Sequence, residues 1–197
     1  MLFFIPLIIY SCKDRFTEGC IDSQAINYSQ HADFDNGTCE YLEIGTFYQG
    51  GIVFYIDDTG LHGLLTSPYD LNEFVPWGCS GITIFNHDVS AFGLGNSNSI
   101  SIANICNESP NAAEQALSYE IENYSDWYLP SVDELYLMYT NIGQGSEIGN
   151  IANLASSAYW SSSENGSDNA WGLSFGSGIF YSHPKGQYWR ARAIRSF

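Results

Sequence analysis

Apolar runs rich in β-branched and aromatic residues alternate with polar, glycine-rich turns along this chain. The run GGIVFYI, residues 50–56, is followed by the turn sequence DDTG and then by HGLLTS. Similar short runs return after residue 158, in AYWSSSE, AWGLSF, GIFYS and YWRARAIRSF. Strand residues bounded by turn residues in this way predict a β-hairpin early in the main domain and several short strands at its end.

Two segments between these strands have helical periodicity. The first follows Ser109 and Pro110, which we interpret as an N-cap and the first helical position. Its apolar residues fall on one helical face: Ala113, Ala116, Leu117 and Ile121. The chain therefore reads as strands, a long loop, two helices and strands, which predicts an α+β fold.

The second helix follows the stretch DWYLPSVDEL, residues 126–135. Ser131 and Glu134 have the spacing of a capping box, in which each side chain bonds the other's backbone N–H. Asp133 favours the positive end of the helix dipole, and Trp127 and Leu129 are expected to point inward. An apolar stripe then runs to Gly143: Leu135, Met138, Tyr139 and Ile142. This stretch is therefore interpreted as a corner of the fold.

Residues 69–110 have little periodicity and are rich in Gly, Asn and Ser. A loop of this length in a compact domain is usually functional or held by a crosslink. Cys79 and Cys106 are placed to provide that crosslink.

The net charge of −16 changes the picture of possible partners. No Lys or Arg occurs between Phe16 and Pro184. A field of this sign repels phosphate backbones and anionic lipids, which excludes nucleic-acid binding as a main role. Cations, neutral glycans and proteins remain as partners.

The first residues, MLFFIPLIIYSCKD, form an apolar run too short to span a bilayer. They resemble a bacterial lipoprotein signal, with Ile9 and Ser11 before a lipidated Cys12. Residues 1–11 are then the signal peptide, and the membrane is reached only through this lipid anchor. A cleaved secretory signal without lipid and an ordinary strand are the alternatives.

If the chain is exported, the four cysteines that remain besides Cys12 can form two disulfides: Cys20, Cys39, Cys79 and Cys106. Four cysteines allow three pairings in an oxidising compartment. Proximity along the chain favours Cys20 with Cys39 and Cys79 with Cys106. Their spacing does not match a zinc site.

Residues 12–43 are predicted to be a tether and a small module, because the segment is too poor in apolar residues to fold without a crosslink. Its sequence resembles a short module of secreted Bacteroidetes proteins, with the pattern Gly-Cys, Ala-x-Asn-Tyr and Asp-x-Gly-x-Cys-Glu-Tyr. Asp33, Asp35 and Asn36 cluster before Gly37, which is chemistry that Ca²⁺ prefers. The alternative is an Asx-turn, in which the same side chains bond the backbone.

A combination of motifs covers residues 44–197: GGIVFYIDDTGLHGLL, WGCSG, GNSNS, DWYLPSVDEL, YWSSSE and RARAIRSF. In this order they resemble the family of the C-terminal domain of the Legionella collagen-like protein, which is close to the Fibrobacter major paralogous domain. The resemblance implies a C-type-lectin-like domain with a mixed antiparallel sheet, two helices and a long loop region. It also implies a surface location, and the characterised relative binds sulfated polysaccharides and host matrix.

Catalytic interpretations find little support. GLSFG, residues 172–176, matches the string of a hydrolase nucleophile elbow, but no Asp or Glu follows Asp168 to complete the triad. A strand that runs into a turn explains the same letters. The fold also resembles the formylglycine-generating enzymes, whose chemistry needs cysteines in the C-terminal half, and none follows Cys106. The chain is therefore expected not to be an enzyme.

Binding is the favoured function. The predicted ligand-facing residues lie in the polar loop SENGSDNAW and in the last strands: Glu164, Asn165, Asp168, Asn169 and Trp189. Trp127, Trp160 and Trp171 are assigned mainly to the core. The four basic residues after Pro184 are few for a sulfated ligand.

We therefore expect an exported outer-membrane or cell-surface lipoprotein of a Gram-negative bacterium that binds a glycan or a surface protein, in adhesion or polysaccharide capture. A structural subunit of a surface assembly is the alternative.

Overall fold

The structure is a computed structural model that describes residues 16–71 and 74–197. The chain divides into two compact units, and the boundary along the sequence falls between Tyr41 and Leu42. The lipidation site predicted at Cys12 lies outside the described residues. Within the described ranges, no helix is long and apolar enough to cross a membrane.

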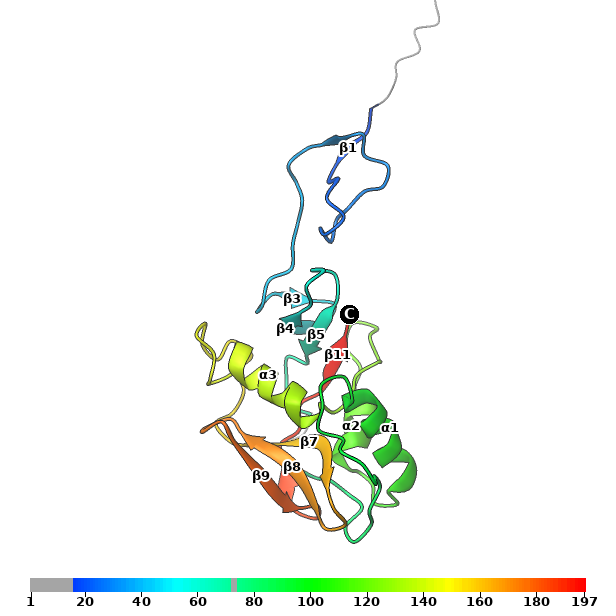
Figure 1. Cartoon of the computed structure of the whole chain (residues 1–197), viewed down its shortest axis with the longest axis vertical. Coiled ribbons are helices and arrows are strands. Elements are labelled where there is room, and N and C mark those ends of the chain that lie inside the picture. The colour runs from blue at the N-terminus through cyan, green and yellow to red at the C-terminus, as the bar shows by residue number, and fades with distance from the viewer. Residues whose placement is uncertain (1–15, 72–73) are drawn as a thin grey trace, which may run out of the picture. The chain divides into compact units, whose positions relative to one another are not determined.

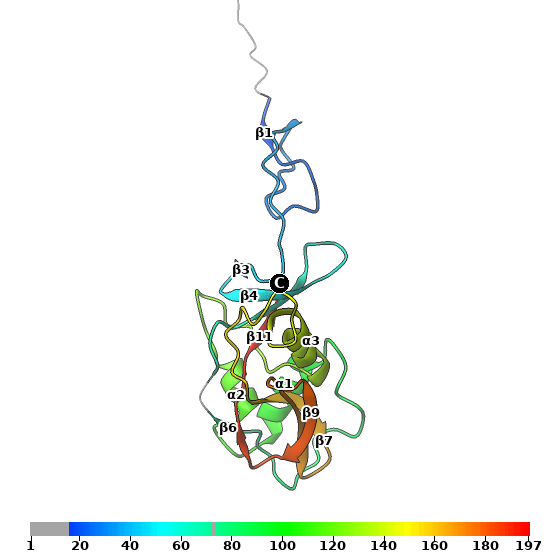
Figure 2. The same ribbon diagram turned by 90° about the vertical axis from the view of Figure 1, so that its left-hand side faces the viewer.

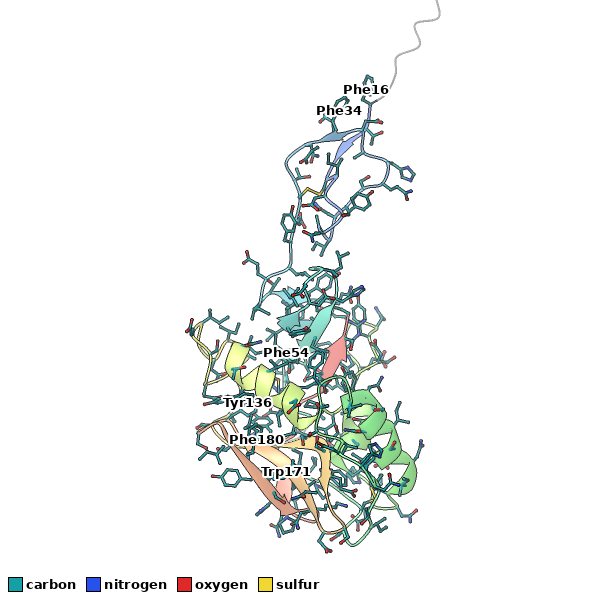
Figure 3. The ribbon with its side chains drawn as sticks, in the orientation of Figure 1. Phe16, Phe34, Phe54, Tyr136, Trp171 and Phe180 are labelled. Atoms are coloured by element: carbon teal, nitrogen blue, oxygen red, sulfur yellow. A yellow bond between two sulfur atoms is a disulfide. The ribbon has the colours of Figure 1, made fainter. Side chains whose placement is uncertain are left out.

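The first unit is a small disulfide-bonded module. Strand β1 (Glu18–Gly19) pairs in parallel with β2 (Phe34–Asp35), and the predicted disulfide joins Cys20 to Cys39. Phe16 and Phe34 contact each other edge to face and are labelled in Figure 3. With so few buried residues, the crosslink supplies much of the unit's stability.

Asn27 explains one of the motifs in this module. Its side-chain amide donates to the carbonyl of Thr38 at 2.6 Å, and its oxygen accepts the N–H of Glu40 at 2.9 Å. One side chain thus joins the two halves of the module beside the disulfide. Asp22 and Tyr41 close the same end through a 2.6 Å hydrogen bond, which lowers the pKa of Asp22 and raises that of Tyr41.

The described part of the second unit contains two larger antiparallel sheets and one two-stranded sheet, and a helix, α3, lies between the two larger sheets (Figures 1 and 2). The first sheet has the order β11-β5-β4-β3: β3 (Phe47–Tyr48), β4 (Gly51–Ile56), β5 (Gly63–Thr66) and β11 (Ile194–Ser196). The predicted hairpin is the β4–β5 pair. The last strand, β11, pairs with β5, so it lies at one edge of this sheet and β3 at the opposite edge.

The second sheet holds three of the four strands predicted near the C-terminus, whereas the fourth, YWRARAIRSF, is divided into two short strands that lie in other sheets. Its order is β7-β8-β9: β7 (Ala158–Asn165), β8 (Asn169–Ser174) and β9 (Ile179–Pro184). Strand β10 (Tyr188–Trp189) pairs with β6 (Val75–Pro76) in a separate two-stranded sheet. Strand β8 ends at Ser174 and runs into a turn, which is the structural explanation of the GLSFG string.

The described residues of this unit form three helices, whereas the sequence predicted two. Helix α3 (Val132–Ile142) has the predicted capping box: Ser131 Oγ accepts the N–H of Glu134, and the Glu134 carboxylate accepts the N–H of Ser131 at 2.7 Å. The prediction for α2 (Ala112–Leu117) was partly wrong. Its N-cap is Asn111, not Ser109, because Asn111 forms its own capping box with Glu114. Ile121 lies beyond the helix, in a bridge with Tyr124.

Helix α1 (Gly95–Ile105) falls inside the segment predicted to be loop. Its buried face consists of Gly95, Asn98, Ser99 and Ile102. These four residues have helical spacing, but three of them are polar residues or glycine and poor helix formers. The buried face is therefore not visible as a repeat of apolar residues in the sequence. Hydrogen bonds hold this face of the helix in place of apolar packing. Asn98 donates to the carbonyl of Val89 at 2.9 Å, and Ser99 Oγ bonds both backbone groups of Leu129.

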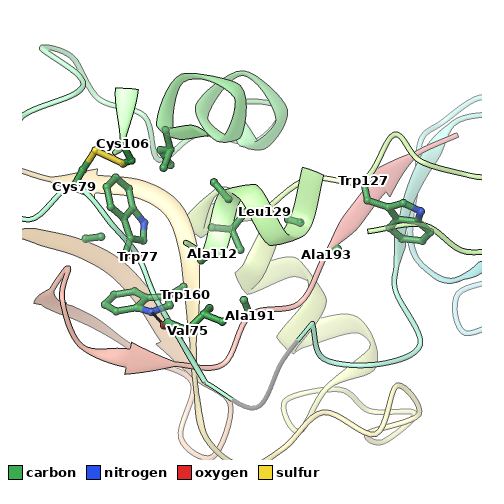
Figure 4. Close-up of a cluster of buried hydrophobic side chains, with 14 of the residues drawn as sticks. Val75, Trp77, Cys79, Cys106, Ala112, Trp127, Leu129, Trp160, Ala191 and Ala193 are labelled. Atoms are coloured by element: carbon green, nitrogen blue, oxygen red, sulfur yellow. Dashed lines mark hydrogen bonds between the residues drawn. A yellow bond between two sulfur atoms is a disulfide. The ribbon is translucent and has the colours of Figure 1, made fainter. Parts of the chain in front are cut away.

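The main core surrounds the second disulfide. Figure 4 shows Cys79 bonded to Cys106 beside Trp77, with Trp160 nearby. Both indole N–H groups are satisfied: Trp77 donates to the carbonyl of Ser161 at 2.8 Å and Trp160 to that of Val75 at 2.9 Å. The disulfide therefore crosslinks the long segment before α2 to itself, and the hydrogen bond from Trp77 to Ser161 attaches this segment to β7.

Candidate functional site

Glu164 was predicted to face a ligand, and the structure contradicts this. Its side chain is 2% exposed and forms an ion pair with the fully buried Lys185 at 2.5 Å. Its oxygens also accept the backbone N–H groups of Ile84 and Phe85, at 2.9–3.0 Å. Every contact of this carboxylate is internal, so Glu164 anchors the 79–85 loop to the sheet.

The rest of the predicted loop stays at the surface. Asn165 and Asn169 pair where β7 and β8 meet, and Asn165 donates to Ser182 Oγ at 2.6 Å. Asp168 is exposed and accepts a hydrogen bond from Ser167 Oγ at 2.8 Å. These three residues form a turn at the surface, and their contact with a ligand stays a prediction.

Trp189 was predicted to offer a flat face to a sugar ring. Both faces of its indole are occupied: Trp160 stacks at 4.3 Å between ring centroids, and His183 at 4.6 Å. Glycine at position 172 is required here, because a Cβ there would lie 2.5 Å from the Trp189 ring. Trp189 is therefore a packing residue, unavailable for stacking a ligand.

The predicted calcium ligands all accept backbone N–H groups. Asp33 accepts the N–H of Thr17 at 2.8 Å, Asp35 that of Gly37 at 2.9 Å, and Asn36 that of Thr38 at 3.1 Å. The Asx-turn alternative thus describes Asp35 and Asn36, whereas Asp33 bonds a distant part of the module. In the described part of the chain, no three His, Cys, Asp or Glu residues are grouped to hold a metal ion.

A hollow of about 390 Å³ lies where the second sheet meets the start of α3. Its lining combines two aromatic rings, two carboxylates and a hydroxyl: Asp88, Ser90, Val132, Asp133, Trp171 and Phe180. Trp171 and Phe180 project from the same face of the sheet, because Phe180 pairs with Leu173, two residues beyond Trp171. We call this the Trp171 hollow.

The aromatic side of the Trp171 hollow is held by α3. Phe180 is 43% exposed, and its ring packs on Tyr136 at 5.2 Å between centroids. Figure 3 labels Tyr136, Phe180 and Trp171 along the same side of the domain. Phe180 lies on β9, the edge strand, so its ring remains open to solvent beyond the helix.

The acidic side is held by a chain of hydrogen bonds from β7. Ser163 Oγ donates to the carbonyl of Val89 and accepts the N–H of Val132, each at 2.9 Å. The N–H of Asp133 then donates to the carbonyl of Ser90 at 3.2 Å. The 88–90 loop is thereby fixed to the first turn of α3, which places its polar groups beside Trp171.

Hydrogen bonds from Ser90 lower the pKa of Asp88 below its ordinary value, and His87 adds a smaller effect. Asp88 is therefore an ionised acceptor near neutral pH, with Asp133 exposed on the facing helix turn. The hollow can accept hydrogen bonds from hydroxyl or amide donors while an apolar ring face packs on Trp171.

Sequence reasoning missed this site for identifiable reasons. Trp127 and Trp160 are buried as predicted, but Trp171 is only partly buried. Asp133 had been assigned to the helix dipole alone. The sequence held one signal for this site. Ile179, Phe180 and Tyr181 are consecutive apolar or aromatic residues, so they do not alternate with polar residues as in a strand with one buried face. In the structure all three side chains are exposed on an edge strand.

Comparison with solved structures finds a fimbrial protein from Bacteroides ovatus, with a TM-score of 0.50 and 15% sequence identity. The similarity covers 82% of this chain and 51% of that one, so this chain corresponds to about half of its neighbour. At this identity the similarity concerns the fold. No curated protein matches the chain.

The Lcl C-terminal domain matches residues 81–195, which is more than half of the chain. The matched range contains the Trp171 hollow, all three helices and the second sheet. The match starts after the β4–β5 hairpin, so the resemblance of residues 44–80 to this family rests on their sequence motifs alone. The chain belongs to the Lcl C-terminal domain family.

Proposed function

We propose that this chain is an exported, non-catalytic surface protein that captures a neutral polysaccharide in the Trp171 hollow. The observation that carries the proposal is the pairing of an accessible Trp171–Phe180 surface with the carboxylates of Asp88 and Asp133. A sugar ring offers an apolar C–H face and a rim of hydroxyl donors, and this lining complements both. Membership of the Lcl C-terminal domain family supports a surface role.

The charge distribution argues for a neutral ligand. All four basic residues of the second unit form internal ion pairs. Lys185 pairs with Glu164; Arg190 and Arg192 both pair with Asp70, at 2.9 and 2.8 Å; and Arg195 pairs with Asp126. In the described residues, no basic side chain is left to bind a sulfate or a carboxylate.

The two disulfides support export to an oxidising compartment. We further propose lipidation at Cys12 and attachment to the outer membrane or cell surface of a Gram-negative bacterium. We include Ca²⁺ binding in the proposal, and the comparison of calcium with chelator in the glycan array tests it.

A structural subunit of a surface assembly is the second candidate. Strand β9 is an edge strand with Ile179, Phe180 and Tyr181 exposed, between 43% and 52%. Open edges of this kind accept a further strand from another chain. The fimbrial protein with a similar fold favours the same idea.

The test is a glycan array probed with the oxidised full chain, with calcium and then with chelator. Trp171→Ala and Asp133→Asn should abolish or weaken binding of neutral glycans, while Asp168→Asn, in the nearby turn, should leave it unchanged. Thermal unfolding of each variant checks that the fold is retained.

Loss of binding in Asp168→Asn but not in Trp171→Ala would move the site to the 165–169 turn. Silence on the array, together with self-association that Tyr181→Lys removes, would favour the structural subunit. Chelator-sensitive binding would establish a role for calcium.

A further inference from the structure

A second hollow, also of about 390 Å³, lies in the same unit beside the β4–β5 hairpin. Four aromatic residues from four separate segments contribute to its lining: Tyr55, Phe92, Tyr128 and Phe197. Tyr55 and Phe92 contact each other edge to face, at 5.0 Å between centroids. Tyr128 is buried, whereas Phe92 is 46% exposed. The hollow thus has an aromatic floor and an aromatic rim.

Two carboxylates, Asp57 and Glu134, also line the hollow. Glu134 is fully buried, and its oxygens accept the N–H groups of Gly93 at 3.1 Å and Ser131 at 2.7 Å. Asp57 is half-buried, and its Oδ1 accepts both the N–H and the hydroxyl of Thr59, at 3.0 and 2.6 Å. These bonds hold both acids in place, and His62, which also lines the hollow, contributes least among the causes that lower the pKa of Asp57.

No Lys or Arg lines this hollow, and those of the surrounding unit are paired with other acids. A hollow with four aromatic rings, two carboxylates, one histidine and neither Lys nor Arg complements a positively charged ligand. A metal ion is disfavoured, because it needs several oxygen or nitrogen ligands and the described residues hold no such group of three. An organic cation needs none of these bonds.

We propose that this hollow binds a trimethylammonium group, as carried by choline. Such a group is weakly hydrated, so it can leave water for an aromatic surface where a small, strongly hydrated ion cannot. The rings of Tyr55, Phe92 and Phe197 offer their π-electrons, and Asp57 and Glu134 supply the opposite charge. Free choline, a trimethylated lysine side chain and a phosphocholine head group share this chemistry.

The first measurement is a calorimetric or NMR titration of the oxidised full chain with choline chloride at constant ionic strength. The control ligand is dimethylbutanol, the uncharged isostere in which a tert-butyl group replaces trimethylammonium. Choline should bind saturably and at least about tenfold more tightly than the alcohol, because only choline gains the cation–π and carboxylate attraction.

Matched variants locate the site. Phe92→Ala and Asp57→Asn should each weaken choline binding at least about fivefold. Two variants serve as controls. Phe180→Ala removes a ring from the Trp171 hollow, and Phe180 is 43% exposed, close to the 46% of Phe92. Asp58→Asn removes the acid next to Asp57 in the sequence, which does not line the proposed choline site. Neither control should change choline binding, and Asn at position 57 can keep the bonds to Thr59.

The proposal fails if choline does not bind saturably, if the alcohol binds equally well, or if the controls weaken binding as much as the test variants. If choline binds, titrations with a trimethyl-lysine peptide and with phosphocholine vesicles identify the molecule that carries the trimethylammonium group. The carrier that binds more tightly is the better candidate for the natural ligand. Glycan binding in the Trp171 hollow is independent, so either proposal can fail alone.

Discussion

Replacement of Lys185 by Met should strongly destabilise the second unit. Lys185 is fully buried, and its ammonium donates to Glu164 at 2.5 Å and to the carbonyl of Ile82 at 2.7 Å, 4.7 Å from the centroid of the Trp77 ring. Methionine fills similar space but donates no hydrogen bond. Glu164 would be left as a buried carboxylate supported only by the N–H groups of Ile84 and Phe85.

The expected cost follows from these contacts. Loss of the charged hydrogen bond is worth about 1.5–3 kcal/mol, and the stranded carbonyl of Ile82 about 1–3 kcal/mol more. Breaking one partner of a buried ion pair costs about 3–5 kcal/mol in total. The double variant Lys185→Met/Glu164→Gln should recover at least about 1 kcal/mol relative to the sum of the single changes, because it removes both charges.

Urea unfolding with the disulfides intact measures these free energies. Tryptophan fluorescence reports on this unit alone, because all five tryptophans lie after residue 42. Arg190→Met is the matched control: Arg190 is 26% exposed, and Asp70 keeps its bond to Arg192, so the loss should be smaller. A Lys185→Met loss below about 1 kcal/mol, the scale of a surface pair, would refute the reasoning.

Three further changes test the caps and crosslinks. Ser131→Ala should cost about 1 kcal/mol in urea unfolding and leave glycan binding intact, because it removes only the cap of α3; lost binding in a stable protein would contradict this. Cys79→Ala with Cys106→Ala opens a loop with a sequence separation of 27 and should cost about 3–4 kcal/mol; a negligible change would show that the segment is held by packing alone. Burial raises the pKa of Glu134 above its ordinary 4.5, so the native state binds the proton more tightly and its contribution to stability falls as pH rises from 4.5 through the raised value. Glu134→Gln should remove that component of the pH dependence, and identical profiles for the two proteins would argue against it.

Several elements were predictable because their signals are local. The capping box of α3 needs only Ser131 and Glu134 at the right spacing, and a hairpin needs two apolar runs around a turn. The disulfides follow cysteine proximity in the chain. Helix α1 was missed because its buried face is built mainly from Asn, Ser and Gly, whose partners lie far away in the sequence.

The candidate site was less predictable than the fold. Glu164 and Asp133 look alike in the sequence, as acids close to apolar strands or helices. Lys185, 21 positions away, converts Glu164 into an internal anchor, whereas Asp133 remains exposed beside Trp171. Trp171 and Trp189 exchange their predicted roles for the same reason, since Trp160 and His183 cover Trp189.

By itself, the sequence determined the α+β class, the crosslinks, the capped helix and an acidic chain with few basic residues. These depend on short-range spacing, on composition and on a small number of possible cysteine pairings. The tertiary structure alone decided which acids are free and which aromatic rings are open, because a side chain's accessibility depends on partners brought together from distant segments. Both proposed binding hollows consist of residues that become neighbours only when the chain folds.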